Sequence, residues 1–386
     1  MNYKFNTKCL YGNNEKRLVE NTGALSFPIY QSATFAHPGV GQSTGYDYSR
    51  LQNPTREELE KVVNTLENGY DTISFSSGMA AMNALMELFS PGDQMIASDD
   101  LYGGSIRIFE HINKKNGVQV SYADTSDPSN IIKEINSKTK AVFIESPTNP
   151  MMNVSDLNAI AGLAKEHNLL LIVDNTFLSP YFQNPIRLGA DIVLHSGTKF
   201  LCGHNDTLAG FLTVANADLS ERFRFIVKTT GAGLAPFDSW LLLRGIKTLP
   251  IRMEYQQTNA LRIAQWLEQQ PKVQSVYYIG LPSHPGYEIN QRQSRGFGSI
   301  LSFRVDSEKT AVQLLERVNV IRYAESLGGV ESLITYPMLQ THADVPKEDR
   351  EAKGINETLL RLSVGIEHID DLLYDLNQAL NQDDAS

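Results

Sequence analysis

The sequence predicts an α/β protein with a mostly parallel central sheet, helices on both faces of that sheet, and a smaller C-terminal α+β domain. Two observations favour this fold class. Short, continuously apolar runs alternate with stretches of helical periodicity up to about residue 245, and such runs are typical of parallel strands that are buried on both faces. Beyond Gly245 one long helical stretch is followed by further strands, which indicates a second domain.

The spacing of apolar residues predicts the helices. Leu59, Val62, Val63 and Leu66 recur at i, i+3, i+4 and i+7, which is the pattern of an amphipathic helix. The same periodicity predicts further helices over residues 79–89, 252–268 and 370–380.

Apolar runs of strand length predict the sheets. In the main α/β region we expect strands at residues 94–98, 118–123, 141–145, 169–174, 191–195 and 209–214. In the C-terminal part we expect strands at residues 273–278, 300–305 and 358–364.

The first 56 residues differ from the rest of the chain. They are rich in Gly, Tyr, Ser, Asn and Pro and show little periodicity, and the stretch is too long for an ordinary loop. We expect an extended arm, wrapped over its own body or reaching a neighbouring subunit. The predicted organisation is therefore an arm at 1–56, an α/β domain at 57–245 and an α+β domain at 246–386.

The composition excludes several classes of partner. The 386 residues carry a net charge of −10, which argues against nucleic acid and against an anionic membrane surface. No apolar run has the length of a membrane span, and the N-terminus lacks the apolar core of a signal peptide. The two cysteines, Cys9 and Cys202, fit neither a disulfide framework nor a zinc site. We expect a cytoplasmic protein with small-molecule ligands and no metal.

Two features of the predicted α/β region suggest a site for a charged ligand. Residues 76–80 form a turn of small residues before the helix at 79–89, and the free amides of a helix N-terminus bind anions. Asp174 ends the strand at 169–174, where open α/β sheets bind their ligands. An acid at this place can balance a cationic ring nitrogen, although a helix N-cap is the alternative for Asp174 alone.

Lys199 is the strongest single feature. It follows the strand at 191–195, with Ser196 and Thr198 close by in the sequence. A lysine is usually a solvated surface charge, but here the two hydroxyls can hold a phosphate while the desolvated amine acts as a nucleophile. Tyr102, before two glycines, can lie flat on a planar cofactor, although a core tyrosine beside a turn is the alternative.

Specific motifs occur in a fixed order from about Thr22 to Leu380. They are Tyr46–Arg50, Asn53–Arg56, Ser77–Ala80, Tyr102–Gly104, Glu145–Pro150, Asp174–Phe177, His195–Lys199, Ala324–Ser332 and Arg361–Glu367. Together they resemble the pyridoxal-phosphate (PLP) enzyme family of cystathionine γ-synthases, cystathionine lyases and methionine γ-lyases. The resemblance implies the aspartate-aminotransferase-like fold (fold type I). One departure is Gly197, where the family usually has Ala.

The resemblance also implies how PLP is bound. Lys199 would carry PLP as a Schiff base and move protons, Asp174 would pair with the pyridinium nitrogen, and Tyr102 would stack on the ring as the second catalytic residue. The remaining cofactor contacts would come from Gly78, Met79, Ser196 and Thr198, and from Tyr48 and Arg50 of the neighbouring subunit. We therefore expect a homotetramer built from dimers that share their active sites.

For the substrate, the resemblance implies a carboxylate site and a distal site. Arg361 would grip the α-carboxylate bidentately with help from Asn149 and Ser326; without the family, Arg361 would be an ordinary surface residue on a strand. Glu325 and Asp47 would face the distal ammonium of cystathionine, although a solvated loop acid is the alternative for Glu325.

These residues leave more than one reaction open. We expect γ-replacement on an O-acyl-homoserine by cysteine, or by sulfide, as in a cystathionine γ-synthase; residues 203–206 and 236–242 look most like bacterial members of that group. Cleavage of cystathionine by a β- or γ-lyase is the alternative, and Gly104 stands where methionine γ-lyases carry Cys. Other classes are a nucleotide-binding oxidoreductase, disfavoured because no Gly-x-Gly-x-x-Gly follows the first strand, and a catalytically inactive binding protein.

Overall fold

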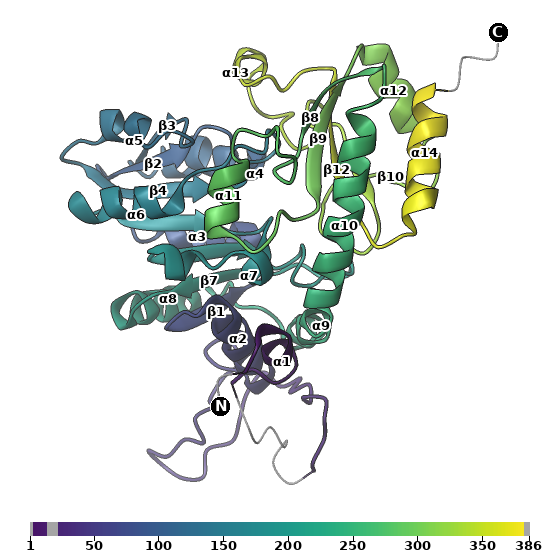
Figure 1. Ribbon diagram of the computed structural model, residues 1–386. Helices are drawn as coiled ribbons and strands as arrows, with labels where there is room; N and C mark the ends of the chain where they lie inside the picture. The colour runs from purple at the N-terminus through teal and green to yellow at the C-terminus, as the bar shows by residue number, and fades with distance from the viewer. Residues whose placement is uncertain (1–2, 14–21, 382–386) are drawn as a thin grey trace. The chain divides into compact units, whose positions relative to one another are not determined.

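The computed structural model describes residues 3–13 and 22–381; residues 1–2 and 14–21 of the predicted arm, and 382–386, lie outside the described residues. The chain divides into two compact units, which are described separately (Figure 1). The first unit contains residues 1–90 and 172–250, and the second contains residues 91–171 and 251–386. In the part of the chain that is described, no helix is both long and apolar enough to cross a membrane.

Four strands form the sheet of the first unit. Their order is β1–β7–β6–β5, with β5 parallel to β6, and with β7 antiparallel to both β6 and β1. The strands are β1 (Asp71–Phe75), β5 (Leu170–Asp174), β6 (Ile192–Ser196) and β7 (Gly210–Val214). Asp174 and Ser196 are the last residues of neighbouring parallel strands, so both lie at the same edge of this sheet.

Helices pack against these strands in the first unit. Both α2 and α8 contact β1, while α3 contacts β6 and β7. The helices are α1 (Phe5–Tyr11), α2 (Pro54–Glu67), α3 (Gly78–Met86), α7 (Ser179–Phe182), η2 (Pro185–Leu188), α8 (Ala217–Thr230) and α9 (Pro236–Ile246). Residues 22–52 have no regular helix or sheet and are largely exposed.

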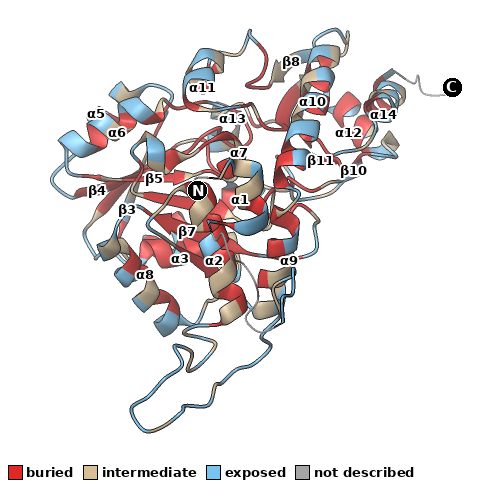
Figure 2. Cartoon of the chain, turned by 60° about the horizontal axis from the view of Figure 1, so that its bottom comes forward, coloured by how far each residue is buried: buried red, intermediate tan, exposed pale blue. Residues whose placement is uncertain are grey.

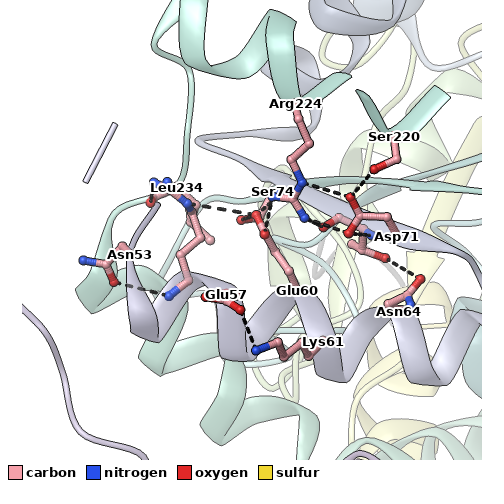
Figure 3. A network of polar contacts seen from close by, with 12 residues as sticks. Asn53, Glu57, Glu60, Lys61, Asn64, Asp71, Ser74, Ser220, Arg224 and Leu234 are labelled. Carbon is pink, nitrogen blue, oxygen red and sulfur yellow. Dashed lines mark hydrogen bonds and ion pairs between the residues drawn. The ribbon is translucent and has the colours of Figure 1, made fainter. Parts of the chain in front are cut away.

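A half-buried ionic network joins α2, β1 and α8 (Figure 3). Arg224 of α8 donates to Asp71 through Nε and Nη2, at 2.9 and 2.7 Å, and to Glu60 Oε2 through Nη1 at 2.6 Å. Glu60 Oε1 accepts from the backbone and hydroxyl of Ser74. Because the buried Glu60 and the half-buried Asp71 share one cation and have further donors, this network fixes α2 and α8 on β1.

The second unit contains a group of three parallel strands and a separate five-stranded sheet. Strand β2 (Gln94–Ser98) pairs with β3 (Gln119–Ala123) and with β4 (Thr139–Glu145). The five-stranded sheet has the order β10–β11–β12–β9–β8. Its strands are β8 (Val273–Tyr277), β9 (Ile300–Val305), β10 (Arg322–Tyr323), β11 (Leu333–Thr335) and β12 (Leu359–Ser363).

Helices α10, α12 and α14 cover this second sheet and share its apolar core (Figure 1). Buried side chains of the three helices pack against β9 and β12, and colouring by burial shows these helices with one buried and one exposed face (Figure 2). The helices of this unit are α4 (Gly103–Arg107), η1 (Ile108–Asn113), α5 (Pro128–Glu134), α6 (Leu157–Glu166), α10 (Leu249–Leu267), α11 (Tyr287–Gln293), α12 (Glu308–Arg317), α13 (Lys347–Ala352) and α14 (Ile369–Asn381).

The predicted elements are confirmed with small changes at their ends, and the strands at 94–98 and 300–305 have the predicted bounds. Strand β1 was not predicted because its apolar run is interrupted by Thr72 and Ser74. Both polar residues are fully buried. Thr213 and Glu60 satisfy their hydroxyls, so tertiary partners make the polar residues compatible with a buried strand.

Candidate active site

The start of α3 has the geometry that suits an anion in the first unit. The helix begins at Gly78, and the hydroxyl of its N-cap Ser77 accepts from the amide of Ala80 at 3.0 Å. The first amides of the helix have no partner within the helix. A Cβ atom placed on Gly78 would lie 3.1 Å from the Cβ of Ser196, so these amides and the Ser196 side chain lie side by side.

The loop after β6 holds Thr198 and Lys199. Thr198 Oγ1 accepts from the amide of Ala209 at 3.0 Å. The Lys199 amide donates to the carbonyl of Ser196 at 3.2 Å, and its carbonyl accepts from Gly203 at 2.7 Å. Lys199 is partly buried rather than a solvated surface charge.

Gly197 has a packing reason that the sequence did not reveal. A Cβ atom at this position would lie 2.4 Å from the ring of Phe211 and 3.1 Å from the Cβ of Ala209. The ring of Phe211 therefore occupies the volume that an alanine side chain would need.

Asp174 ends β5 with a carboxylate that is held by one neighbour. Thr176 donates to Asp174 Oδ1 from its backbone amide at 2.9 Å and from its hydroxyl at 2.6 Å. Burial raises the pKa of the Asp174 carboxyl above its usual value, although the Thr176 hydrogen bonds and the charge of His195 act in the opposite direction. A cationic ring nitrogen beside this carboxyl would favour its ionised form.

The arm residues Asp47, Tyr48 and Arg50 make their contacts with other parts of the first unit. The guanidinium of Arg50 lies 5.6 Å from the ring centroid of Tyr48 and donates to the carbonyl of Lys228 in α8. Asp47 accepts from Ser43 at 2.5 Å and lies 3.6 Å from the ring of His37. Tyr48 and Arg50 are exposed in the single chain.

In the second unit, Arg361 of β12 is the centre of a buried polar cluster. Only 1% of its surface is exposed, so the alternative of a surface strand residue is wrong. Nη1 donates to Asn149 Oδ1 at 2.9 Å, and Nη2 donates to the carbonyl of Ser326 at 2.9 Å and to Thr335 at 3.1 Å. Nε is buried and has no hydrogen-bond partner among the described residues, so it is a donor available to a ligand.

The surroundings of Arg361 combine burial with negative charge. Burial lowers the pKa of Arg361 to about 10, and the charges of Tyr102, Glu145 and Glu325 act in the opposite direction. Glu325 itself is exposed, and Ser326 has a positive φ of 93°. The structure therefore groups Asn149, Ser326 and Glu325 around Arg361.

Glu145 and His342, which were not predicted as site residues, hold Tyr102 and the residue before it in the second unit. The Tyr102 amide donates to Glu145 Oε2 at 2.9 Å, and the preceding carbonyl of Leu101 bonds to His342 Nε2 at 3.0 Å. Tyr102 is 39% exposed, so the alternative of a core tyrosine is wrong. Glu145 opens one of the sequence motifs, whereas the sequence around His342 carries no signal for this contact.

The comparison with protein families decides the class of this site. The family described as Cys/Met metabolism PLP-dependent enzyme matches residues 6–381. The chain belongs to this family. Its cofactor is pyridoxal 5′-phosphate, and the residues fit it: the amides at Gly78 and the hydroxyl of Ser196 suit a phosphate, and Asp174 suits a ring nitrogen. Among the described residues, no cluster of His, Cys, Asp and Glu side chains could hold a metal ion.

Similar proteins of the family carry different activity names. The chain is 50% identical over 366 residues to a cystathionine gamma-synthase/O-acetylhomoserine (thiol)-lyase of Bacillus subtilis, covering 95% of this chain and 94% of the relative. It is 47% identical over 363 residues to a cystathionine beta-lyase of Lactococcus lactis, covering 94% of this chain and 96% of the relative. The chain is thus an enzyme of the cystathionine group.

A solved structure confirms the predicted fold class. The cystathionine gamma-lyase of Lactobacillus plantarum, complexed with L-serine, matches with a TM-score of 0.94 at 42% identity over 98% of each chain. The fold is therefore that of a PLP enzyme with a mixed sheet, surrounding helices and a smaller second sheet.

Proposed function

We propose that this enzyme is a cystathionine γ-synthase that replaces the acyl group of an O-acyl-homoserine with cysteine, and that sulfide can take the place of cysteine. A cystathionine β- or γ-lyase is the second candidate. The relatives support both equally, because a synthase at 50% identity covers 95% of the chain and a β-lyase at 47% identity covers 94% of it.

The observation that carries the proposal is the exposed carboxylate of Glu325 near the buried guanidinium of Arg361. The buried guanidinium has an unpartnered Nε for an α-carboxylate, while the carboxylate of Glu325 is exposed and close enough for its charge to act on Arg361. A carboxylate at that place can receive the distal ammonium of cystathionine. Asp47, which lies beside Ser43 and His37, is the second acid that we propose for the distal end of the substrate.

The proposed reaction uses this chain's own groups to move protons. PLP, when bound, supplies an electron sink for the electrons left by breaking the Cα–H bond. Lys199 Nζ would take the proton from Cα and, after passing it on, the proton from Cβ, so that the acyloxy group leaves Cγ as a carboxylate. The sulfur of cysteine or sulfide would then bond to Cγ, and protons would return to Cβ and Cα. Asp174 would keep the ring nitrogen protonated, and Tyr102 would stack on the ring. Arg361, with Asn149 and Ser326, would hold the substrate by its α-carboxylate.

The remaining cofactor contacts follow the family. We assign the phosphate to the amides of Gly78 and Met79, to the hydroxyls of Ser196 and Thr198, and to Tyr48 and Arg50 of a neighbouring subunit. Shared sites of this kind require at least a dimer, and we propose a homotetramer of two such dimers in the cytoplasm.

A product assay separates the two candidate functions. Purified holoenzyme is given an O-acyl-homoserine with cysteine, then with sulfide, and separately cystathionine alone. A synthase forms cystathionine from the first pair. Rapid release of pyruvate or 2-oxobutyrate from cystathionine, without any replacement product, would overturn the synthase proposal in favour of a β- or γ-lyase.

The role of Glu325 is tested in the same assay. Glu325→Gln should lower kcat/KM about 5- to 30-fold for cystathionine, formed or cleaved, because the distal ammonium loses its anion. The control is Glu348→Gln, since Glu348 is an exposed acid of the same unit. If the two variants had equal effects, or if neither had an effect, Glu325 would not belong to the site.

A further inference from the structure

A buried acid–base pair lies in the first unit, between the end of α2 and strand β6. Glu67, the last residue of α2, is 0% exposed, and His195 of β6 is 1% exposed. Nε2 of His195 lies 2.5 Å from Oε1 of Glu67. No role in binding or chemistry has so far been given to either residue.

The surroundings of Glu67 leave its charge poorly compensated unless His195 carries a proton. Asn175 Nδ2 donates to the same oxygen, Oε1, at 3.0 Å, and also to the carbonyl of Gln183. Oε2 is buried and has no hydrogen-bond partner among the described residues. A fully buried carboxylate with one unsatisfied oxygen is costly unless a cation pairs with it. The contact of 2.5 Å lets Nε2 of His195 donate to Oε1 of Glu67.

A chain of hydrogen bonds connects this pair with Asp174. On the parallel strands β5 and β6, Asp174 is in register with Leu194, the residue before His195. The amide that follows His195, that of Ser196, donates to Thr176 Oγ1 at 2.9 Å. The Thr176 hydroxyl in turn donates to Asp174 Oδ1 at 2.6 Å. A displacement of His195 is therefore passed on to Asp174 and to Ser196.

An electrostatic interaction also connects His195 with Asp174. Burial raises the pKa of Asp174, and a positive charge on His195 opposes that shift. Arg187 of η2 bonds instead to the half-buried Asn68, one residue beyond Glu67. Within the pair, His195 is the member whose positive charge favours an ionised Asp174.

We propose that Glu67 is a positioning residue that holds His195 as a cation behind β5 and β6, and that this cation keeps Asp174 ionised against the ring nitrogen of PLP. The proposal rests on the assignment of the ring nitrogen to Asp174 and is independent of the choice between synthase and lyase. It predicts that Glu67 affects the bound cofactor although it lies on the reverse side of the strands.

The test replaces Glu67 by Gln, which keeps the size and can still accept from His195 and Asn175 but carries no charge. Two quantities are measured: the pH midpoint of the cofactor's visible absorbance, and the dissociation constant of PLP from the apoprotein by equilibrium dialysis. We expect the midpoint to rise by about half a pH unit or more, because a less cationic ring opposes imine protonation less strongly. We expect PLP to bind about three- to tenfold more weakly.

Glu60→Gln is the matched control. Glu60 is on the same helix and is also buried, but its partners are Arg224, Arg56 and Ser74. Both substitutions should lower the free energy of unfolding, whereas only Glu67→Gln should change the midpoint and PLP binding. If Glu67→Gln changes neither quantity, or if Glu60→Gln changes both equally, Glu67 is merely structural and the proposal is wrong.

Two further variants separate the possible failures. His195→Gln should reproduce the effects of Glu67→Gln, and the double variant should add nothing to His195→Gln, because Glu67 acts through His195. These variants also decide the question if Glu67→Gln fails to fold. Asp174→Asn tests the underlying assignment: if it leaves the midpoint unchanged, the ring nitrogen is not at Asp174, and if it alone shifts the midpoint, only the role of Glu67 is wrong.

Discussion

At the scale of single residues, Arg361 shows how a buried charge can be held ready for a ligand. Its two terminal nitrogens are occupied by Asn149, Ser326 and Thr335, while Nε has no partner among the described residues. Orienting the guanidinium in advance lowers the entropy cost of binding a carboxylate. The unpartnered donor destabilises the free protein, and the substrate carboxylate that we propose for this place would recover the cost on binding.

Gly197 gives a prediction at this scale. Gly197→Ala should lower the free energy of unfolding by about 1–3 kcal/mol, because the new methyl group would lie 2.4 Å from the ring of Phe211. Urea unfolding measures the change. Gly162→Ala is the control, since nothing lies within 4 Å of a Cβ at that helical position. It should be neutral or stabilising by up to about 1 kcal/mol. Equal effects of the two variants would mean that Phe211 does not fill this space.

Single residues also show how far the sequence could predict the site. Lys199, Asp174 and Ser196 were found from the residues alone, because each follows a recognisable apolar strand. Arg361 was found only through resemblance to a family, because an arginine inside a strand carries no sign of burial. Glu67 was missed, since at the end of an amphipathic helix a buried glutamate and a solvated one have the same sequence pattern.

At the scale of elements, the network of Arg224 predicts how α2, β1 and α8 depend on one another (Figure 3). Arg224→Gln should cost about 1–3 kcal/mol, because the buried Glu60 and the half-buried Asp71 lose the cation that both share, while solvent screens part of the loss. Within the described residues, Arg222 of the same helix bonds only to the carbonyl of Glu87, so Arg222→Gln should change stability by less than about 0.5 kcal/mol. Unfolding monitored by circular dichroism provides both values. A loss below 1 kcal/mol for Arg224→Gln would show that the network contributes little.

The buried His342, which bonds to the carbonyl before Tyr102, predicts a pH dependence of the free energy of unfolding. Burial lowers the pKa of His342 to about 4, so between about pH 6.5 and 4 the unfolded state binds more protons than the folded state. Stability should therefore fall as the pH falls through this window, by on the order of 2–3 kcal/mol. His342→Gln should remove this part of the slope in urea unfolding at several pH values. The exposed His167 provides the control, and His167→Gln should keep the slope of the unchanged protein. An unchanged slope in His342→Gln would contradict the prediction.

The elements also differ in how well the sequence predicted them. Strands β2 and β9 are continuous apolar runs, and their bounds were predicted correctly. Strand β1 and the short strands β10 and β11 were missed, because their residues become strand only through pairing with distant partners. The helix α1 was missed because it lies in a stretch of low periodicity.

At the scale of the whole molecule, the exposed arm is the feature that the single chain does not explain. Tyr48 and Arg50 are exposed, and Leu25 and Val40 are more than four-fifths exposed at 87% and 105%. Apolar residues exposed together on a long segment are typical of a surface that another chain covers. This supports the proposal that Tyr48 and Arg50 complete the phosphate site of a neighbouring subunit.

Mixing of subunits tests this proposal. Lys199→Ala and Arg50→Ala should each abolish most activity, the first by loss of the amine and the second by weaker PLP binding. In a mixed dimer, the subunit that keeps Lys199 receives Arg50 from its partner, so one site is intact and the other carries both substitutions. Random exchange should therefore restore roughly a quarter of the unchanged activity.

Differently tagged subunits, purified over both tags, verify that exchange has occurred. If doubly tagged dimers stay inactive, Arg50 acts within its own chain, and the arm has to be explained by packing alone.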